Sequence, residues 1–186
     1  MTRARRPQAP GTTQEQDIAA MIRVDHAGEY GAVRIYQGQL AVFGADKKKA
    51  KTASVIRHMA KQEEKHLASF DALINARGVR PTALEPVWRA AGFALGAASA
   101  LMGEKVAMAC TAAVEEVIDS HYASQLERLG DADPALKQTV AEFRADEIAH
   151  RDTALEHGAE QAPAYRLFSG AVKAGCRLAI ALSTRI

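Results

Sequence analysis

Apolar residues recur every three to four positions along most of this chain, and this spacing predicts amphipathic helices rather than strands. The first such run follows Thr13-Gln-Glu-Gln16, which resembles the capping box at the start of a helix. It continues through Ile18, Met21 and Ile22 until Gly44, so we expect one long helix between these limits.

Glycine and proline mark the ends of the other predicted helices. Asp133-Pro134, for example, provides an N-cap followed by proline at the first helical position. Runs of β-branched residues with period-two alternation are absent, so the sequence predicts an all-α protein. The further helices are expected at about residues 46–77, 85–101, 104–129 and 134–157, with a last helix after Pro163.

The chain contains an internal repeat that carries its candidate chemistry. AGEYGAVRIYQGQL (27–40) aligns without a gap over AVEEVIDSHYASQL (113–126), which places Glu29 opposite Glu115. A Glu-x-x-His motif follows 34 residues after the first glutamate and 32 residues after the second. Each half is therefore predicted to be a helix with one inward glutamate, a turn, and a helix with Glu-x-x-His. The other matched pairs are Ala27/Ala113, Tyr36/Tyr122, Gln39/Gln125 and Leu40/Leu126.

Two Glu-x-x-His motifs and two lone glutamates on four long helices match the ligand set of two-metal carboxylate sites in ferritin-like bundles. Four glutamates buried without metal would repel one another, at a cost of several kcal/mol each. Carboxylate and imidazole ligands without thiolate favour iron or manganese over structural zinc. The predicted metal ligands are Glu29, Glu63, His66, Glu115, Glu147 and His150.

Composition limits the class of protein. The 186 residues are 25% charged and 48% hydrophobic, as in a soluble globular domain, and the net charge of +2 argues against a nucleic-acid partner. Two cysteines, Cys110 and Cys176, make no disulfide framework and fit a reducing compartment. Basic residues without an apolar stretch open the chain, so we expect a disordered basic leader over 1–14 and a ferritin-like di-iron domain over 15–186.

An iron pair that activates O₂ leaves three candidate functions at this point. These are an oxygenase, an iron-oxidising or iron-storage protein, and a peroxide reductase. Storage needs a bundle that assembles into a cage. A reductase of the rubrerythrin type normally brings a four-cysteine iron site, for which this chain has too few cysteines.

Two apolar segments lie outside the repeat. Residues 90–102 run without a charge but are too short to span a bilayer, and the last helix is apolar apart from Lys173, Arg177 and Arg185. Both segments fit either ordinary core and an oligomer interface or an interfacial hairpin that lies in a membrane surface and admits a lipid-like substrate. Trp88 and Arg89 suit the headgroup level in the second case.

Several long stretches resemble the demethoxyubiquinone hydroxylases, the di-iron monooxygenases of coenzyme Q biosynthesis. The resemblance covers the chain from about residue 20 to its end, and all six ligand positions are filled. The stretches are VDHAGEYGAVRIY (24–36), QEEKHL (62–67), RPTALEPVWRAAGFALGAASALMG (80–103), AMACTAAVEEVIDSHY (107–122), FRADEIAHRD (143–152) and APAYRLFSGAVKAGCRLAIALS (162–183).

This resemblance implies two iron ions per chain and an O₂-dependent hydroxylation of the ring of a 2-polyprenyl-3-methyl-6-methoxy-1,4-benzoquinone or quinol. It also implies electrons from NADH, a peripheral position on the membrane, and association with other quinone-biosynthesis proteins. The expected location is the cytoplasmic face of a bacterial inner membrane, or the matrix side of the mitochondrial one in a eukaryote. A homo-oligomer stays open. No glycine cluster follows a predicted strand, so the residues that bind NADH stay unassigned.

Residues beside the ligands are candidates for supporting roles, because a ligand histidine usually donates its second N–H to a carboxylate. Tyr36 and Tyr122 are expected to pack, to hydrogen-bond a ligand glutamate, or to bind quinone. No catalytic residue beyond the ligands is predicted. Asp25, Asp119 and Asp146 are the candidate carboxylates, with surface acids as the alternative, and the ambiguous neighbours are His26, His58, His121 and Glu116.

Overall fold

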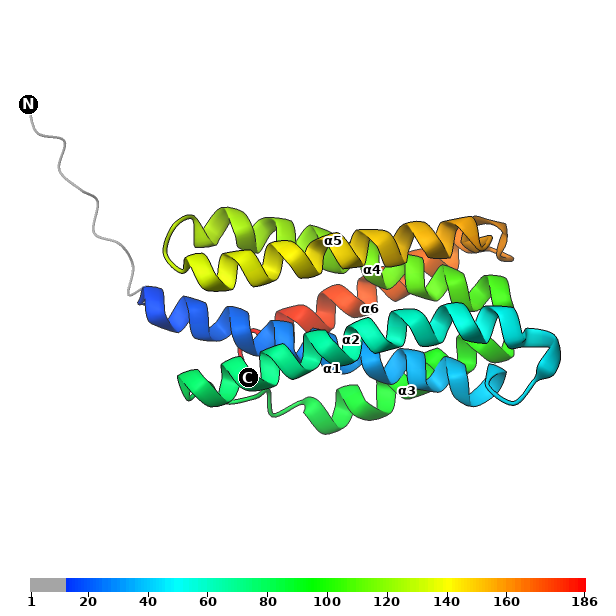
Figure 1. The fold of residues 1–186 in the computed structure, drawn as a ribbon, viewed down its shortest axis with the longest axis horizontal. Coiled ribbons are helices and arrows are strands. Elements are labelled where there is room, and N and C mark those ends of the chain that lie inside the picture. The colour runs from blue at the N-terminus through cyan, green and yellow to red at the C-terminus, as the bar shows by residue number, and fades with distance from the viewer. Residues whose placement is uncertain (1–12) are drawn as a thin grey trace, which may run out of the picture.

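The computed structural model describes residues 13–186, and it confirms an all-α, ferritin-like helical bundle without strands in that part of the chain. Figure 1 shows the arrangement of its elements. The α-helices are α1 (Gln14–Phe43), α2 (Ala50–Arg77), α3 (Glu85–Leu101), α4 (Glu104–Leu129), α5 (Pro134–Glu156) and α6 (Tyr165–Ser183), and the 3₁₀ turns are η1 (Lys47–Lys49) and η2 (Ala159–Gln161).

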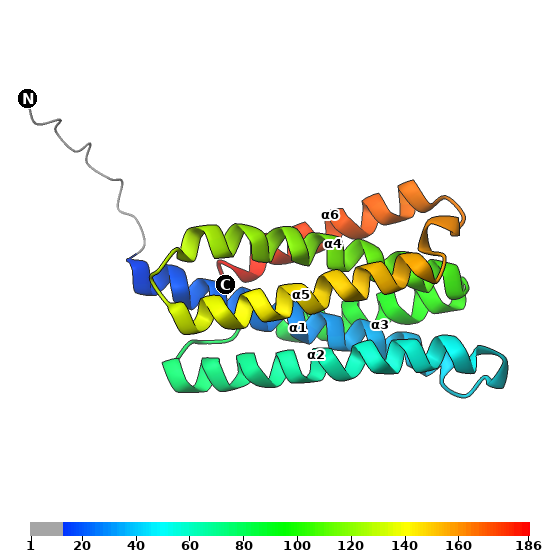
Figure 2. The same ribbon diagram turned by 45° about the horizontal axis from the view of Figure 1, so that its top comes forward.

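The internal repeat corresponds to two helical hairpins. Helices α1 and α2 form the first and α4 and α5 the second, and the two hairpins lie side by side in both views (Figures 1 and 2). Helices α3 and α6 pack on α1 and α4, away from α2 and α5. We call α3 and α6 the outer layer.

The helix ends follow the local chemistry that the sequence indicated. The Thr13 side chain accepts from Gln16 N while Gln16 accepts from Thr13 N, which completes the capping box. Asp133 caps α5 by accepting from Leu136 N. The expected start of the second helix near residue 46 is four residues early, because Asp46 caps the 3₁₀ turn instead.

The predicted leader, residues 1–14, lies outside the described residues except for Thr13 and Gln14, which belong to the start of α1. Within residues 13–186, no helix is both long enough and apolar enough to cross a membrane.

Packing against α1 accounts for one of the two apolar faces of helix α3. Its glycine face packs against α1, where a Cβ at Gly96 would collide with the carbonyl oxygen of Ile35, and one at Gly38 with that of Phe93. Glycine is therefore required for this close approach. The opposite face of α3 carries exposed apolar side chains such as Val87.

Interior contacts also join α3 to α6. Leu95 and Val172 belong to one apolar cluster with Cys110 of α4, and the Trp88 indole N–H donates to Ser183 Oγ at 2.9 Å. The outer layer is thus held to the bundle on its inner side, and the two predicted apolar segments also meet at the Trp88–Ser183 hydrogen bond.

Candidate metal centre

The six predicted ligand residues lie together inside the bundle, supplied by α1, α2, α4 and α5. They form two overlapping groups, and in each group the ligand-type atoms all lie within 4.8 Å of one another. Site A consists of Glu29, Glu63, His66 and Glu147. Site B consists of Glu63, Glu115, Glu147 and His150. Glu63 and Glu147 belong to both sites, so they can bridge two ions.

The Glu-x-x-His motifs build this arrangement because residues three apart share one face of a helix. Each histidine also reaches across to the other hairpin. His66 Nδ1 lies 3.2 Å from Glu147 Oε1, and His150 Nδ1 lies 2.9 Å from Glu63 Oε1. The Nδ1 atoms therefore face the carboxylates, and the Nε2 atoms point outward.

Buried polar atoms in proteins are usually hydrogen-bonded, and many of those in the centre of this bundle are not. Each of the six side chains is at most 2% exposed, yet eight of their oxygen and nitrogen atoms have no hydrogen-bond partner. These atoms belong to all six predicted ligands. Oxygen and imidazole atoms left in this state are what a pair of transition-metal ions would coordinate, so the residues fit iron or manganese.

Electrostatics point the same way. Burial and the charges of neighbouring glutamates raise the pKa of Glu63 and of Glu115 well above the ordinary range. Burial opposes a charged His66, but the carboxylates of Glu147 and Glu29 beside its Nδ1 outweigh burial and raise the pKa of His66 to about 10. In the metal-free centre these raised pKa values favour protons bound to Glu63, Glu115 and His66, at the positions that cations would occupy.

Two buried tyrosines donate hydrogen bonds to the lone glutamates of the opposite hairpin. Tyr36 Oη donates to Glu115 Oε1 at 2.9 Å, and Tyr122 Oη donates to Glu29 Oε1. Burial raises the pKa of both phenols well above 10, so they stay protonated. Two of the three roles expected for these tyrosines are observed, because each donates to a predicted ligand glutamate and each ring also packs in an apolar cluster. Quinone binding stays a prediction.

The outward nitrogens of the two histidines have different partners. His66 Nε2 lies 3.1 Å from Asp146 Oδ2, which confirms Asp146 as a neighbour of a ligand histidine. His150 Nε2 lies 3.2 Å from Gln62 Oε1, a contact that the sequence analysis missed. The repeat carried the signal, because Gln62 precedes Glu63 as Asp146 precedes Glu147.

The other two candidate carboxylates do not hydrogen-bond to a predicted ligand histidine. Asp25 Oδ1 accepts from Gln125 Nε2 at 2.7 Å and lies 3.1 Å from His121 Nε2. Asp119 accepts from Arg144 Nε at 2.7 Å instead.

The remaining neighbours stand apart from the ligands. His26 Nε2 lies 2.9 Å from Asp71 Oδ1, and His58 is exposed. Glu116 is exposed and accepts from Lys173 Nζ at 2.5 Å.

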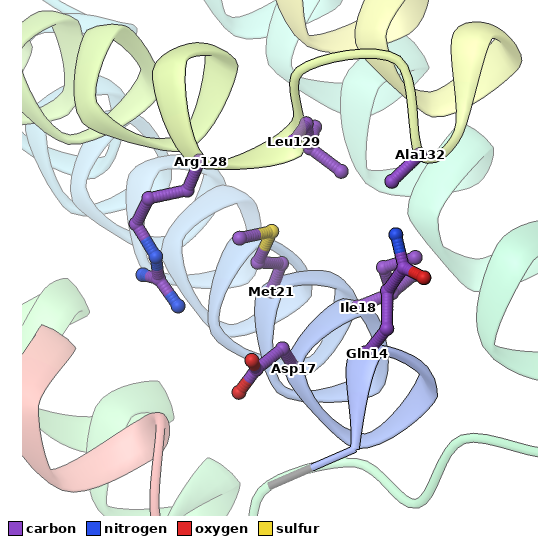
Figure 3. Close-up of a pocket in the computed structure, with 7 residues that line it drawn as sticks. All are labelled: Gln14, Asp17, Ile18, Met21, Arg128, Leu129 and Ala132. Carbon is purple, nitrogen blue, oxygen red and sulfur yellow. The ribbon is translucent and has the colours of Figure 1, made fainter. Parts of the chain in front are cut away.

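Two cavities lie at the ends of the bundle. One of about 70 Å³ sits between the start of α1 and the α4–α5 turn (Figure 3). The other, of about 410 Å³, lies by the α3–α4 turn, next to Gly103 and His157. None of the six ligands lines either cavity.

Fold and site together define a ferritin-like helical bundle with carboxylate–histidine clusters suited to metal ions. The chain belongs to the family described as ubiquinone biosynthesis protein COQ7, whose model matches residues 16–183. The family includes ubiquinone-biosynthesis hydroxylases, and this confirms the resemblance drawn from the sequence.

Three relatives illustrate the match. The 3-demethoxyubiquinol 3-hydroxylase of Rhodospirillum rubrum is 56% identical over 169 residues, covering 91% of this chain and 78% of the relative. The human NADPH-dependent mitochondrial 3-demethoxyubiquinone 3-hydroxylase is 49% identical over 173 residues, with coverage of 91% and 78%. The mitochondrial 5-demethoxyubiquinone hydroxylase of Saccharomyces cerevisiae is 40% identical over 181 residues, with coverage of 89% and 77%.

Proposed function

We propose that this chain is a di-iron monooxygenase that hydroxylates the ring of a demethoxyubiquinone or demethoxyubiquinol with O₂. The observation that carries the proposal is the pair of overlapping sites with eight unpartnered ligand atoms inside the bundle. The relatives' names supply the substrate class. Bound iron would supply the activation of O₂, a reaction that amino-acid side chains do not perform alone.

The chain's own residues hold and orient this centre. Glu63 and Glu147 would be shared by the two ions, while Glu29 and Glu115 would each hold one of them. Tyr36 and Tyr122 fix the lone glutamates by hydrogen bonds, so one oxygen of each stays directed at its site. The apolar surroundings exclude bulk water from the reacting ring.

The outer layer is the proposed contact with the membrane and with the polyprenyl tail. It exposes large apolar side chains, among them Leu167 at 78% and Leu178 at 60%. Exposed patches of this kind mark interaction surfaces, and a lipid-like substrate requires access from a membrane. We therefore propose peripheral binding to the inner membrane of a bacterium or mitochondrion, alongside other quinone-biosynthesis proteins.

A reduced nicotinamide nucleotide is the proposed source of electrons. NADH was expected from the sequence, whereas the names of several relatives, the human one included, specify NADPH. An activity assay with each nucleotide in turn distinguishes them.

Labelled oxygen tests the proposed reaction. The iron-loaded, reduced protein is mixed with ¹⁸O₂ and a demethoxyquinol, and the product is analysed by mass spectrometry. We expect one labelled oxygen on the ring. Unchanged quinone together with a growing ferric core in a large cage would establish the iron-storage alternative instead, and consumption of peroxide without hydroxylation would establish a reductase.

A further inference from the structure

The two metal sites are related by the internal repeat, but the residues that surround them are not equivalent. We infer that site A binds a divalent ion more tightly than site B, because matched positions are acidic beside site A and neutral beside site B. The inference rests on the proposed two-metal function.

The first difference lies behind the histidines. Asp146 and Gln62 occupy matched places in the repeat, one residue before the motif glutamate. His66 of site A faces the carboxylate of Asp146, and His150 of site B faces the neutral amide of Gln62. A carboxylate acceptor makes the imidazole a more basic ligand than an amide acceptor does, so it strengthens the bond from Nδ1 to a cation.

The second difference lies one turn before each lone glutamate. Asp25 precedes Glu29 of site A by four residues, and Thr111 precedes Glu115 of site B by four. Both are buried, and both meet the matched glutamine: Gln125 Nε2 donates to Asp25 Oδ1 at 2.7 Å. Gln39 Nε2 lies 3.4 Å from Thr111 Oγ1. A buried carboxylate thus stands near site A where site B has a hydroxyl.

Two acids on the side of site B run against this trend, but each is paired with a cation. Glu116, which matches Tyr30 in the repeat, accepts from Lys173 Nζ. Asp119 follows Glu115 by four residues, where the first half has Val33. It accepts from Arg144 Nε at 2.7 Å and lies 3.4 Å from Arg151 Nη1. Its field at site B is therefore largely cancelled. Neither Asp25 nor Asp146 has an arginine or lysine among its hydrogen-bond or ion-pair partners within the described residues.

The inference is tested by titrating the metal-free protein with Fe(II) under anaerobic conditions and measuring the heat of binding by calorimetry. The wild-type protein should bind two ions in two steps of unequal affinity. Asp146→Asn should weaken the tighter step about tenfold, the range typical for a partner of a ligand histidine. Gln62→Glu should strengthen the weaker step. Both changes should therefore bring the two steps closer together.

The matched control is Glu142→Gln, which removes one charge one turn before Asp146 on an exposed part of α5. It should leave both steps unchanged. If Asp146→Asn and Gln62→Glu move the steps further apart, site B is the tighter one and the inference is overturned. Equal effects on both steps, or none, overturn it as well while leaving the two-metal function intact. Failure of the wild-type protein to bind Fe(II) would overturn both.

Discussion

The centre of the bundle and the outer layer are exceptional in opposite ways. In the centre, eight buried polar atoms lack partners, although a buried polar group without a hydrogen bond is costly. In the outer layer, Leu167 and Leu178 are exposed although apolar burial drives folding. Both arrangements are unfavourable unless the buried atoms bind ions and the exposed side chains contact an apolar partner.

The difference indicates what each region needs. Carboxylate and imidazole atoms converging within 4.8 Å need cations, which are small and can enter a closed site. Apolar side chains on the exposed side of α3 and α6 need a large apolar neighbour. The two regions should therefore respond to different substitutions, and each can be changed without the other.

The largest effect is expected in the centre. Glu63→Gln replaces a bridging carboxylate by an amide of the same shape, so the protein should lose most of its bound iron, as measured by elemental analysis. Burial and the nearby glutamates raise the pKa of Glu63 well above its ordinary range, which favours the neutral carboxyl in the metal-free protein, and the amide of glutamine has nearly the same shape. The free energy of unfolding of the metal-free variant should therefore lie within about 1 kcal/mol of the wild-type value.

Glu64→Gln is the matched control, since Glu64 is the exposed neighbour on the same helix. It should keep the full iron content. Retention of two irons by Glu63→Gln would show that the shared glutamates do not bridge. A large loss of metal-free stability would show that Glu63 supports the fold itself.

The sequence predicted the centre better than its surroundings, for a physical reason. The Glu-x-x-His spacing is set within one helix, and the repeat shows that it occurs twice, so the six residues that lie together in the centre could all be named. The partners of Asp25 and Asp119 depend on how neighbouring helices are rotated, and no local pattern records that. Gln62 could have been found by extending the repeat one residue before Glu63.

The outer layer is expected to respond next. Leu178→Asp and Val87→Asp place a charge on exposed positions of α6 and α3, where the side chains are 60% and 52% exposed. Each should weaken binding to phospholipid vesicles about tenfold or more, since a charge among acyl chains costs on the order of 2–3 kcal/mol. Co-sedimentation measures this, and the iron content should not change.

These positions are better probes than Phe93 or Leu95. Arg34 lies over the Phe93 ring at 5.1 Å, and Leu95 packs in the interior cluster, so a charge there would disturb other contacts. Ala141→Asp on the exposed part of α5 is the control and should not affect vesicle binding. Unchanged binding in both outer-layer variants would remove the outer layer as the membrane contact.

The smallest expected effect is the release of protons when the centre binds metal, which a substitution in the outer layer should not change. The pKa of His66 is raised to about 10 and those of Glu63 and Glu115 are raised well above their ordinary range, which favours bound protons on these groups in the metal-free protein. Because a metal ion competes with those protons, uptake of two ions should release about three, and affinity should rise with pH. Calorimetry in buffers of different ionisation enthalpy measures the number. The Leu178→Asp variant should release the same number as wild type, since its change lies outside the centre. Uptake without proton release would mean that Glu63 and Glu115 are already charged and His66 already neutral in the metal-free bundle, and the electrostatic account of the centre would be wrong.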